Sequence, residues 1–165
     1  MNNEGLTLIE LMVVVAIVAM LATLALTGYH STREKVKVEN EIKALYGNLQ
    51  NAKMRAFAEK RVWGIYWGSS PFTSYEMRYD TNGDESITDS GGYNSTGTVS
   101  DLQYPIVSRF SGSATYVRFY PSGLTTSLGS FHINSSEAEY DCVSVAKSRI
   151  KMGKWNATSN ECVKR

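Results

Sequence analysis

The sequence predicts an α+β protein in which a long N-terminal helix packs against a β-rich, antiparallel globular head. Residues 6–26 form an almost unbroken apolar run. The stretch up to about residue 60 repeats apolar residues at three- and four-residue steps, the spacing of one helix face. The remainder is rich in Gly, Ser, Thr and Tyr and divides into short runs separated by turn residues. We therefore expect a short leading segment over 1–5, a hydrophobic helix over 6–28, an amphipathic helix over 29–60 and a head over 61–165.

Composition narrows the class of protein. The 165 residues carry a formal net charge of +1, with 20% charged and 42% hydrophobic residues. This composition is globular, and it gives no strong field that would attract nucleic acid or an anionic membrane surface. Neither His30 nor His132 is flanked by a convincing serine, cysteine or carboxylate partner for catalysis, and no phosphate-binding or zinc motif occurs. We predict that the chain is not an enzyme.

The apolar run is long enough to cross a bilayer, because as a helix it would extend for roughly 30 Å. Only Thr7, Glu10 and Thr23 interrupt it. A secretory signal peptide would have a positive segment before a shorter run, whereas here the helical pattern continues beyond Gly28. We expect an anchor that stays attached. The carboxylate of Glu10 is costly in such a segment, so it either reaches the headgroups or has a cationic partner.

The stretch Gly5-Leu-Thr-Leu-Ile-Glu10-Leu closely resembles the processing motif of type IV prepilins and type II secretion pseudopilins. The resemblance implies a pilin fold and a leader, residues 1–5, that prepilin peptidase removes between Gly5 and Leu6. It also implies N-methylation of Leu6. Glu10 would then pair with the N-terminal amine of a neighbouring subunit during filament assembly.

The amphipathic helix over 29–60 has one apolar stripe, formed by Val38, Ile42, Leu45, Leu49, Ala52 and Ala56. We expect the stripe to pack against the chain's own head; the alternative is a groove for a partner. Glu39 and Lys43 are spaced for an i,i+4 ion pair.

The head is predicted to be mostly antiparallel. Strands are expected at 62–67, 75–79, 102–107, 115–120, 130–133 and 140–151, separated by Gly- and Pro-containing turns. Cys142 and Cys162 could stay reduced and buried, or could form one disulfide that stabilises the fold by about 3 kcal/mol. An exported head would lie in an oxidising compartment, which favours the disulfide.

Two stretches of the head, residues 51–62 and 117–123, resemble the H-type pseudopilins and FimT-like minor pilins. This resemblance implies a minor subunit of a type IV pilus or type II secretion filament. A major pilin and a DNA-binding minor pilin for DNA uptake are the alternatives.

A candidate calcium site lies at Asp80, Asn82 and Asp84, whose oxygens alternate as in calcium-binding loops. The loop lacks the usual glycine after Asp84 and the closing glutamate, and a polar Asn-Gly turn is the alternative. No other cofactor is expected.

A candidate nucleic-acid surface lies near the C-terminus, where Arg149, Lys151 and Lys154 accompany Trp155. Cations hold phosphates and an aromatic ring can stack on a base. The alternative is the solvated face of a strand.

Partners and location follow from the resemblance. It implies contacts with prepilin peptidase, an inner-membrane assembly platform and other pilin or pseudopilin subunits. The head would bind DNA or a secreted substrate in the alternative roles. The chain would begin as a single-pass protein of the bacterial inner membrane with a periplasmic head and would end in an envelope or surface filament.

Overall fold

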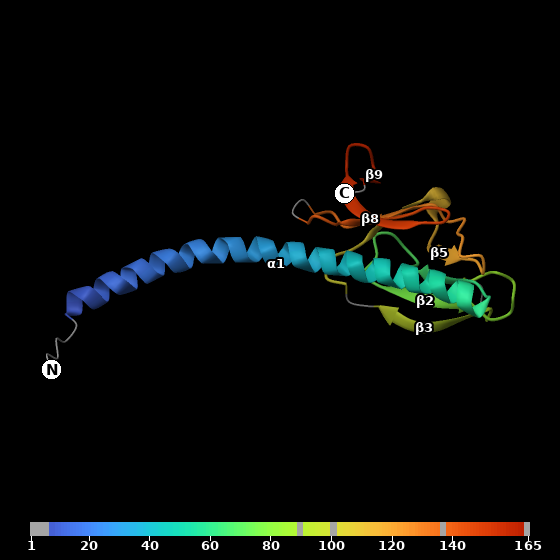
Figure 1. The fold of residues 1–165 in the computed structure, drawn as a ribbon, viewed down its shortest axis with the longest axis horizontal. Helices are drawn as coiled ribbons and strands as arrows, with labels where there is room; N and C mark the ends of the chain where they lie inside the picture. The colour runs from blue at the N-terminus through green and yellow to red at the C-terminus, as the bar shows by residue number, and fades with distance from the viewer. Residues whose placement is uncertain (1–6, 89–90, 100–101, 136–137, 164–165) are drawn as a thin grey trace.

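A single long helix organises the molecule. The computed structural model describes residues 7–88, 91–99, 102–135 and 138–163, without the side chains of 23–31 and of residue 113. Helix α1 (Leu8–Glu59) has 52 residues, a length of about 78 Å. Its N-terminal part projects away from the head as an arm, and its C-terminal part lies across the head (Figure 1). Lys60 ends the helix in a left-handed conformation, with φ of 53°.

Two antiparallel sheets form the head. The first has the strand order β3-β2-β1-β5. Its strands are β1 (Trp63–Tyr66), β2 (Tyr75–Asp80), β3 (Tyr93–Val99) and β5 (Tyr116–Phe119). The second has the order β4-β6-β7-β8-β9. It comprises β4 (Val107–Phe110), β6 (Gly129–His132), β7 (Cys142–Val145), β8 (Ile150–Asn156) and β9 (Glu161–Val163). A short 3₁₀ turn, η1 (Ser111–Ser113), follows β4.

The helix stripe predicted from the sequence forms the centre of the core. All six of its apolar residues are at most 1% exposed: Val38, Ile42, Leu45, Leu49, Ala52 and Ala56. The large side chains of Trp63, Phe119 and Phe131 on the sheets are buried to the same extent. The prediction of a helix packed on its own head is confirmed. The Glu39–Lys43 ion pair also forms, with 3.3 Å between Lys43 Nζ and Glu39 Oε2.

Two predicted strands are wrong. Residues 102–106 form a loop rather than a strand, because their backbone groups bond outside any sheet. Ile106 forms an isolated bridge with Phe72, and the carboxylate of Glu41 accepts hydrogen bonds from the backbone N–H groups of residues 103 and 104. The predicted strand 140–151 is interrupted by a turn, closed by a hydrogen bond from Ala146 N to Arg149 O of 2.8 Å. β3 was not predicted, because its polar residues 94–98 show no apolar alternation.

Two glutamates of α1 attach the helix to loops of the head. Glu41 accepts hydrogen bonds from the backbone N–H groups of Gln103, at 2.8 Å, and Tyr104, at 3.3 Å. Glu39 accepts one from Glu139 N at 3.0 Å. These hydrogen bonds satisfy loop N–H groups that are not paired in either sheet. They also attach the end of the head nearest the arm, here called the base of the head, to the helix.

The arm of α1 is apolar and exposed. Between residues 8 and 22 its large hydrophobic side chains are more than half exposed, from 52% at Val13 to 77% at Leu8. Within the described residues, no helix has a stretch long and apolar enough to cross a membrane. The predicted membrane segment, 6–28, includes Leu6 and side chains after residue 22 that lie outside the described part, so it stays a prediction.

Candidate functional site

The start of α1 holds the residues of the predicted assembly site. Thr7 and Glu10 form a capping box, in which Glu10 N donates to Thr7 Oγ1 at 3.4 Å. Glu10 Oε2 in turn accepts from Thr7 N at 3.0 Å and from Thr7 Oγ1 at 2.8 Å. The carboxylate therefore lies at the first turn, where helix N–H groups lack partners. Gly5 and Leu6 lie outside the described residues, so their predicted roles are untested.

The sequence analysis did not predict that Glu10 caps the start of α1. The signal was present, because Thr7-Leu8-Ile9-Glu10 matches the Thr-x-x-Glu pattern that begins many helices. Glu10 thus has a local partner in the single chain. The predicted pairing of Glu10 with the N-terminal amine of a neighbouring subunit would either replace the hydrogen bonds from Thr7 or form in addition to them.

The predicted calcium loop binds its own backbone. Asp80 Oδ1 accepts from the N–H groups of Asn82, at 3.0 Å, and Gly83, at 2.8 Å, and Asp80 Oδ2 accepts from Glu85 N at 2.9 Å. Asp84 Oδ1 accepts from Ser86 N at 2.8 Å. Across the described residues, no group of three or more His, Cys, Asp or Glu side chains could hold a metal ion. The calcium site stays a prediction, and these contacts match the alternative of a polar turn.

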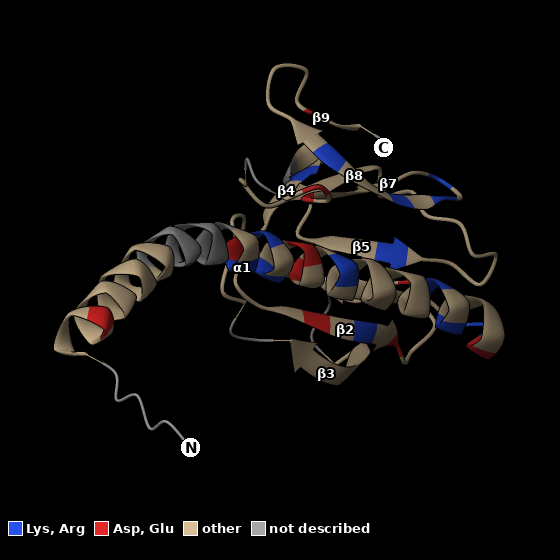
Figure 2. Cartoon of the chain, turned by 60° about the vertical axis from the view of Figure 1, so that its left-hand side comes forward, with Lys and Arg blue, Asp and Glu red and all other residues tan. Residues whose placement is uncertain are grey.

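The three predicted nucleic-acid residues have different surroundings. Arg149 and Lys151 are exposed near the β7–β8 turn. Lys154 lies on the other side of β8, where its Nζ contacts Asp141 Oδ2 at 2.8 Å and donates to Ser135 O and Ala138 O. The assignment of Lys154 to a nucleic-acid surface is therefore not supported, because its ammonium group joins parts of the head. Most of the charged residues coloured in Figure 2 belong to the head and to the part of α1 that crosses it.

A disulfide joins Cys142 of β7 to Cys162 of β9, as the sequence analysis favoured. The hairpin of β8 and β9 is thereby fixed beside β7. Next to it, Trp155 stacks on His132 with ring centroids 3.8 Å apart and an angle of 3° between the planes. Burial lowers the pKa of His132 to about 4, and the charge of Arg109 acts in the same direction. His132 is therefore neutral at physiological pH.

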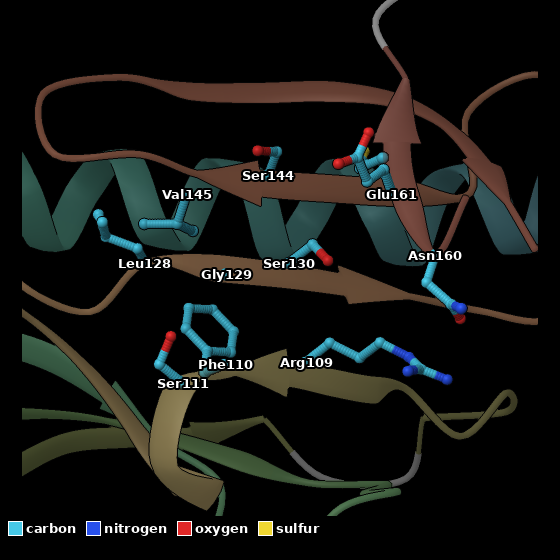
Figure 3. Close-up of a pocket in the computed structure, with 11 residues that line it drawn as sticks. Arg109, Phe110, Ser111, Leu128, Gly129, Ser130, Ser144, Val145, Asn160 and Glu161 are labelled. Atoms are coloured by element: carbon cyan, nitrogen blue, oxygen red, sulfur yellow. The ribbon is translucent and has the colours of Figure 1, made fainter.

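The face of the second sheet turned away from α1 carries an open groove of about 680 Å³, here called the outer groove. Figure 3 shows its lining on β4, β6, β7 and β9. The polar residues of the lining are Arg109, Ser111, Ser130, Ser144, Asn160 and Glu161, and the remainder are Phe110, Leu128, Gly129, Val145 and Cys162. Sequence analysis did not find this groove, because strand register alone brings its residues together.

Comparison with known proteins adds a motif and a fold. Residues 1–26 match the family model of the prokaryotic N-terminal methylation motif. No curated protein matches the sequence. The type IV minor pilin FimU of Pseudomonas aeruginosa has a similar structure, with a TM-score of 0.54 and 13% identity over 73% of this chain and 91% of FimU. The minor pseudopilin EpsH of the Vibrio cholerae type 2 secretion system gives 0.54 and 10% identity, over 71% of this chain and 95% of EpsH.

The chain has a long helix that begins within a methylation motif and packs on an antiparallel head, which is the architecture of a pilin-like fold. The predicted fold class is confirmed, since at these identities the solved structures show a shared fold. The motif and the fold together fit the type IV pilin and pseudopilin family. The prediction that the chain is not an enzyme stays a prediction.

Proposed function

We propose that the chain is a minor subunit of a cell-envelope filament, either a minor pilin of a type IV pilus or a pseudopilin of a type II secretion system. In this role it contributes structure and no catalysis. Prepilin peptidase removes residues 1–5, Leu6 becomes the methylated N-terminus, and an inner-membrane assembly platform inserts the subunit among other pilins or pseudopilins.

The observation that carries the proposal is the exposed apolar arm, residues 8–22 of α1, which lies within the matched methylation motif. A helix that is apolar all round needs a covering, from lipid or from other helices. Residues 8–22 of α1 have no such covering from the head, because their large hydrophobic side chains are all more than half exposed. A bilayer before assembly and a bundle of helices after assembly would provide it.

The role of Glu10 can be separated from its capping contact by two substitutions. Glu10→Gln keeps a side chain that can complete a capping box, whereas Glu10→Ala removes both the cap and the charge. If Glu10 pairs with a neighbour's amine, both variants should be cleaved normally and both should be absent from sheared filaments. Thr7→Ala is the control, since it weakens the cap and keeps the carboxylate. Normal incorporation of Glu10→Gln would refute the pairing and leave only the capping role.

Deletion of the gene distinguishes the two machines. Loss of protein secretion with intact pili would indicate a type II secretion pseudopilin, and loss of pili with intact secretion would indicate a pilus subunit. Retention of both functions would refute the proposed role.

DNA binding is a second candidate, favoured by one observation. Arg149 and Lys151 are exposed beside the same turn and make no ion pair within the described part of the chain. Replacing either with Gln should weaken binding to duplex DNA and make it less sensitive to salt. Binding that is absent at low salt, or that both substitutions leave unchanged, would refute this role.

A further inference from the structure

The outer groove contains a row of polar side chains on three neighbouring strands. Arg109 of β4 pairs with Ser130 of β6, and Ser130 pairs with Ser144 of β7. Directly opposed residues project from the same face of a sheet, so the three side chains lie side by side on the groove floor. Ser130 is only 9% exposed. Its hydroxyl makes no hydrogen bond with any described residue and lines the groove, so it can bond to a ligand there.

Arg109 is also available for a ligand. Within the described part of the chain its guanidinium forms no ion pair or hydrogen bond. It lies over the Trp155 ring, 5.6 Å from the centroid, and Trp155 in turn stacks on His132. The stack supports the guanidinium from one side and leaves its N–H donors unused. Figure 3 shows Arg109 extended along the edge of the groove.

The two ends of the groove have different chemistry. At one end Leu128 is 49% exposed. Beside it the Phe110 ring packs against Phe131 and Trp67 of the core and against Gly129, where a Cβ atom would collide with that ring and with Arg109 O. Glycine is therefore required there for the aromatic ring to approach the strand. At the other end lie Asn160, in the turn before β9, and Glu161 of β9, and the disulfide of Cys162 fixes their position.

Three classes of ligand fit this lining poorly. The carboxylate of Glu161 balances the charge of Arg109, so the groove has no excess of positive charge for a polyanion. A peptide cannot extend the sheet at Ser108 of β4, because Ser70 Oγ accepts from Ser108 N at 2.9 Å and donates to Ser108 O at 3.4 Å. A wholly apolar ligand would leave Arg109 and Ser130 without partners.

We propose that the outer groove binds a neutral oligosaccharide of two or three sugar units. Sugar hydroxyls both donate and accept hydrogen bonds, as this lining requires: Arg109 donates, Glu161 accepts, and Ser130, Ser144 and Asn160 do both. Leu128, which lines the groove and is 49% exposed, supplies an apolar surface for the C–H face of a sugar ring. The volume of about 680 Å³ lies in the range of ligand sites, roughly 300–1,000 Å³. This activity is additional to filament assembly and does not depend on it.

The test is glycan binding by the purified full chain. The chain is kept in a detergent without a sugar headgroup, labelled and applied to an array of neutral and acidic glycans. The neutral glycan with the strongest signal is then titrated by calorimetry. We expect saturable binding. Arg109→Ala should weaken it about 10- to 100-fold, since hydrogen bonds to a charged group are lost. Arg109→Lys should fall between Arg109→Ala and the unmodified chain, because Lys lacks the planar fork of donors.

Two further variants guard against misfolding and non-specific effects. Glu161→Gln changes an exposed residue on another strand and should weaken binding several-fold. Lys147→Gln, which removes an exposed positive charge outside the groove, is the matched control and should bind as the unmodified chain does. The proposal is overturned if no neutral glycan binds, if only acidic glycans bind, or if Arg109→Ala and Lys147→Gln bind equally well. Because binding is measured on isolated subunits, failure of filament assembly would not affect this outcome.

Discussion

Replacement of Lys154 by Met should strongly destabilise the head. Lys154 Nζ lies 2.8 Å from Asp141 Oδ2 and donates to Ser135 O at 2.8 Å and to Ala138 O at 2.7 Å. The Asp141 side chain is 2% exposed and that of Lys154 is 25% exposed. Lys154→Met keeps the volume and removes the charge, so Asp141 remains as a buried carboxylate without its cation.

The size of the effect follows from this geometry. Removing one partner of a buried ion pair typically costs about 3–5 kcal/mol. A quarter of the Lys154 side chain is exposed, so water can compensate in part, and we expect a loss of about 2–3 kcal/mol. For a head of this size, that corresponds to a fall in Tm of about 8–20 °C.

Thermal melts of the full chain in micelles measure this difference. Near-UV circular dichroism is the suitable signal, because it follows the aromatic residues of the head rather than the helical arm. Lys151→Met is the matched control: Lys151 lies on the same strand and is exposed, so its loss should change stability by less than about 0.5 kcal/mol. Equal melting temperatures for Lys154→Met and Lys151→Met would refute the structural role of Lys154.

Four other perturbations test the fold and the sites. Leu45→Ala should cost about 2–5 kcal/mol in denaturant unfolding, because Leu45 is completely buried; a loss below 1 kcal/mol would contradict the packing of α1. Replacing Cys142 and Cys162 with Ser should cost about 3 kcal/mol in the same assay, and equal stability would contradict a stabilising disulfide. The lowered pKa of His132, about 4, predicts stability that is lost as pH falls from about 6.5 towards 4, because the unfolded chain takes up the proton first; melts of His132→Gln should lack this component. Millimolar calcium should raise the Tm if the loop at Asp80 binds it, and an unchanged Tm would remove that prediction.

The sequence was informative where local spacing determines structure. The stripe from Val38 to Ala56 follows helix periodicity, so its burial could be predicted residue by residue. Strands with alternating apolar residues, such as β2 and β5, were found for the same reason. β3 was missed because its residues are polar on both faces, and only pairing with β2 makes it a strand.

The sites depended more on tertiary contacts. Glu10 could be identified because a carboxylate within an apolar run is visible in the sequence alone. The different environments of Lys151 and Lys154 could not be predicted, because they depend on strand register and on the position of Asp141. Arg109, Ser130 and Ser144 are likewise distant in sequence and meet only through the pairing of β4, β6 and β7.

The bonds from Glu39 and Glu41 to the loops of the head have a mechanical consequence. In a filament under tension, force would enter each subunit through the helical arm and would reach the head first at these hydrogen bonds. They lie near the base of the head, where several must break together before the helix can slide along the sheets. The head would therefore be loaded in shear rather than opened strand by strand, and the two glutamates would act as the mechanical clamp between arm and head.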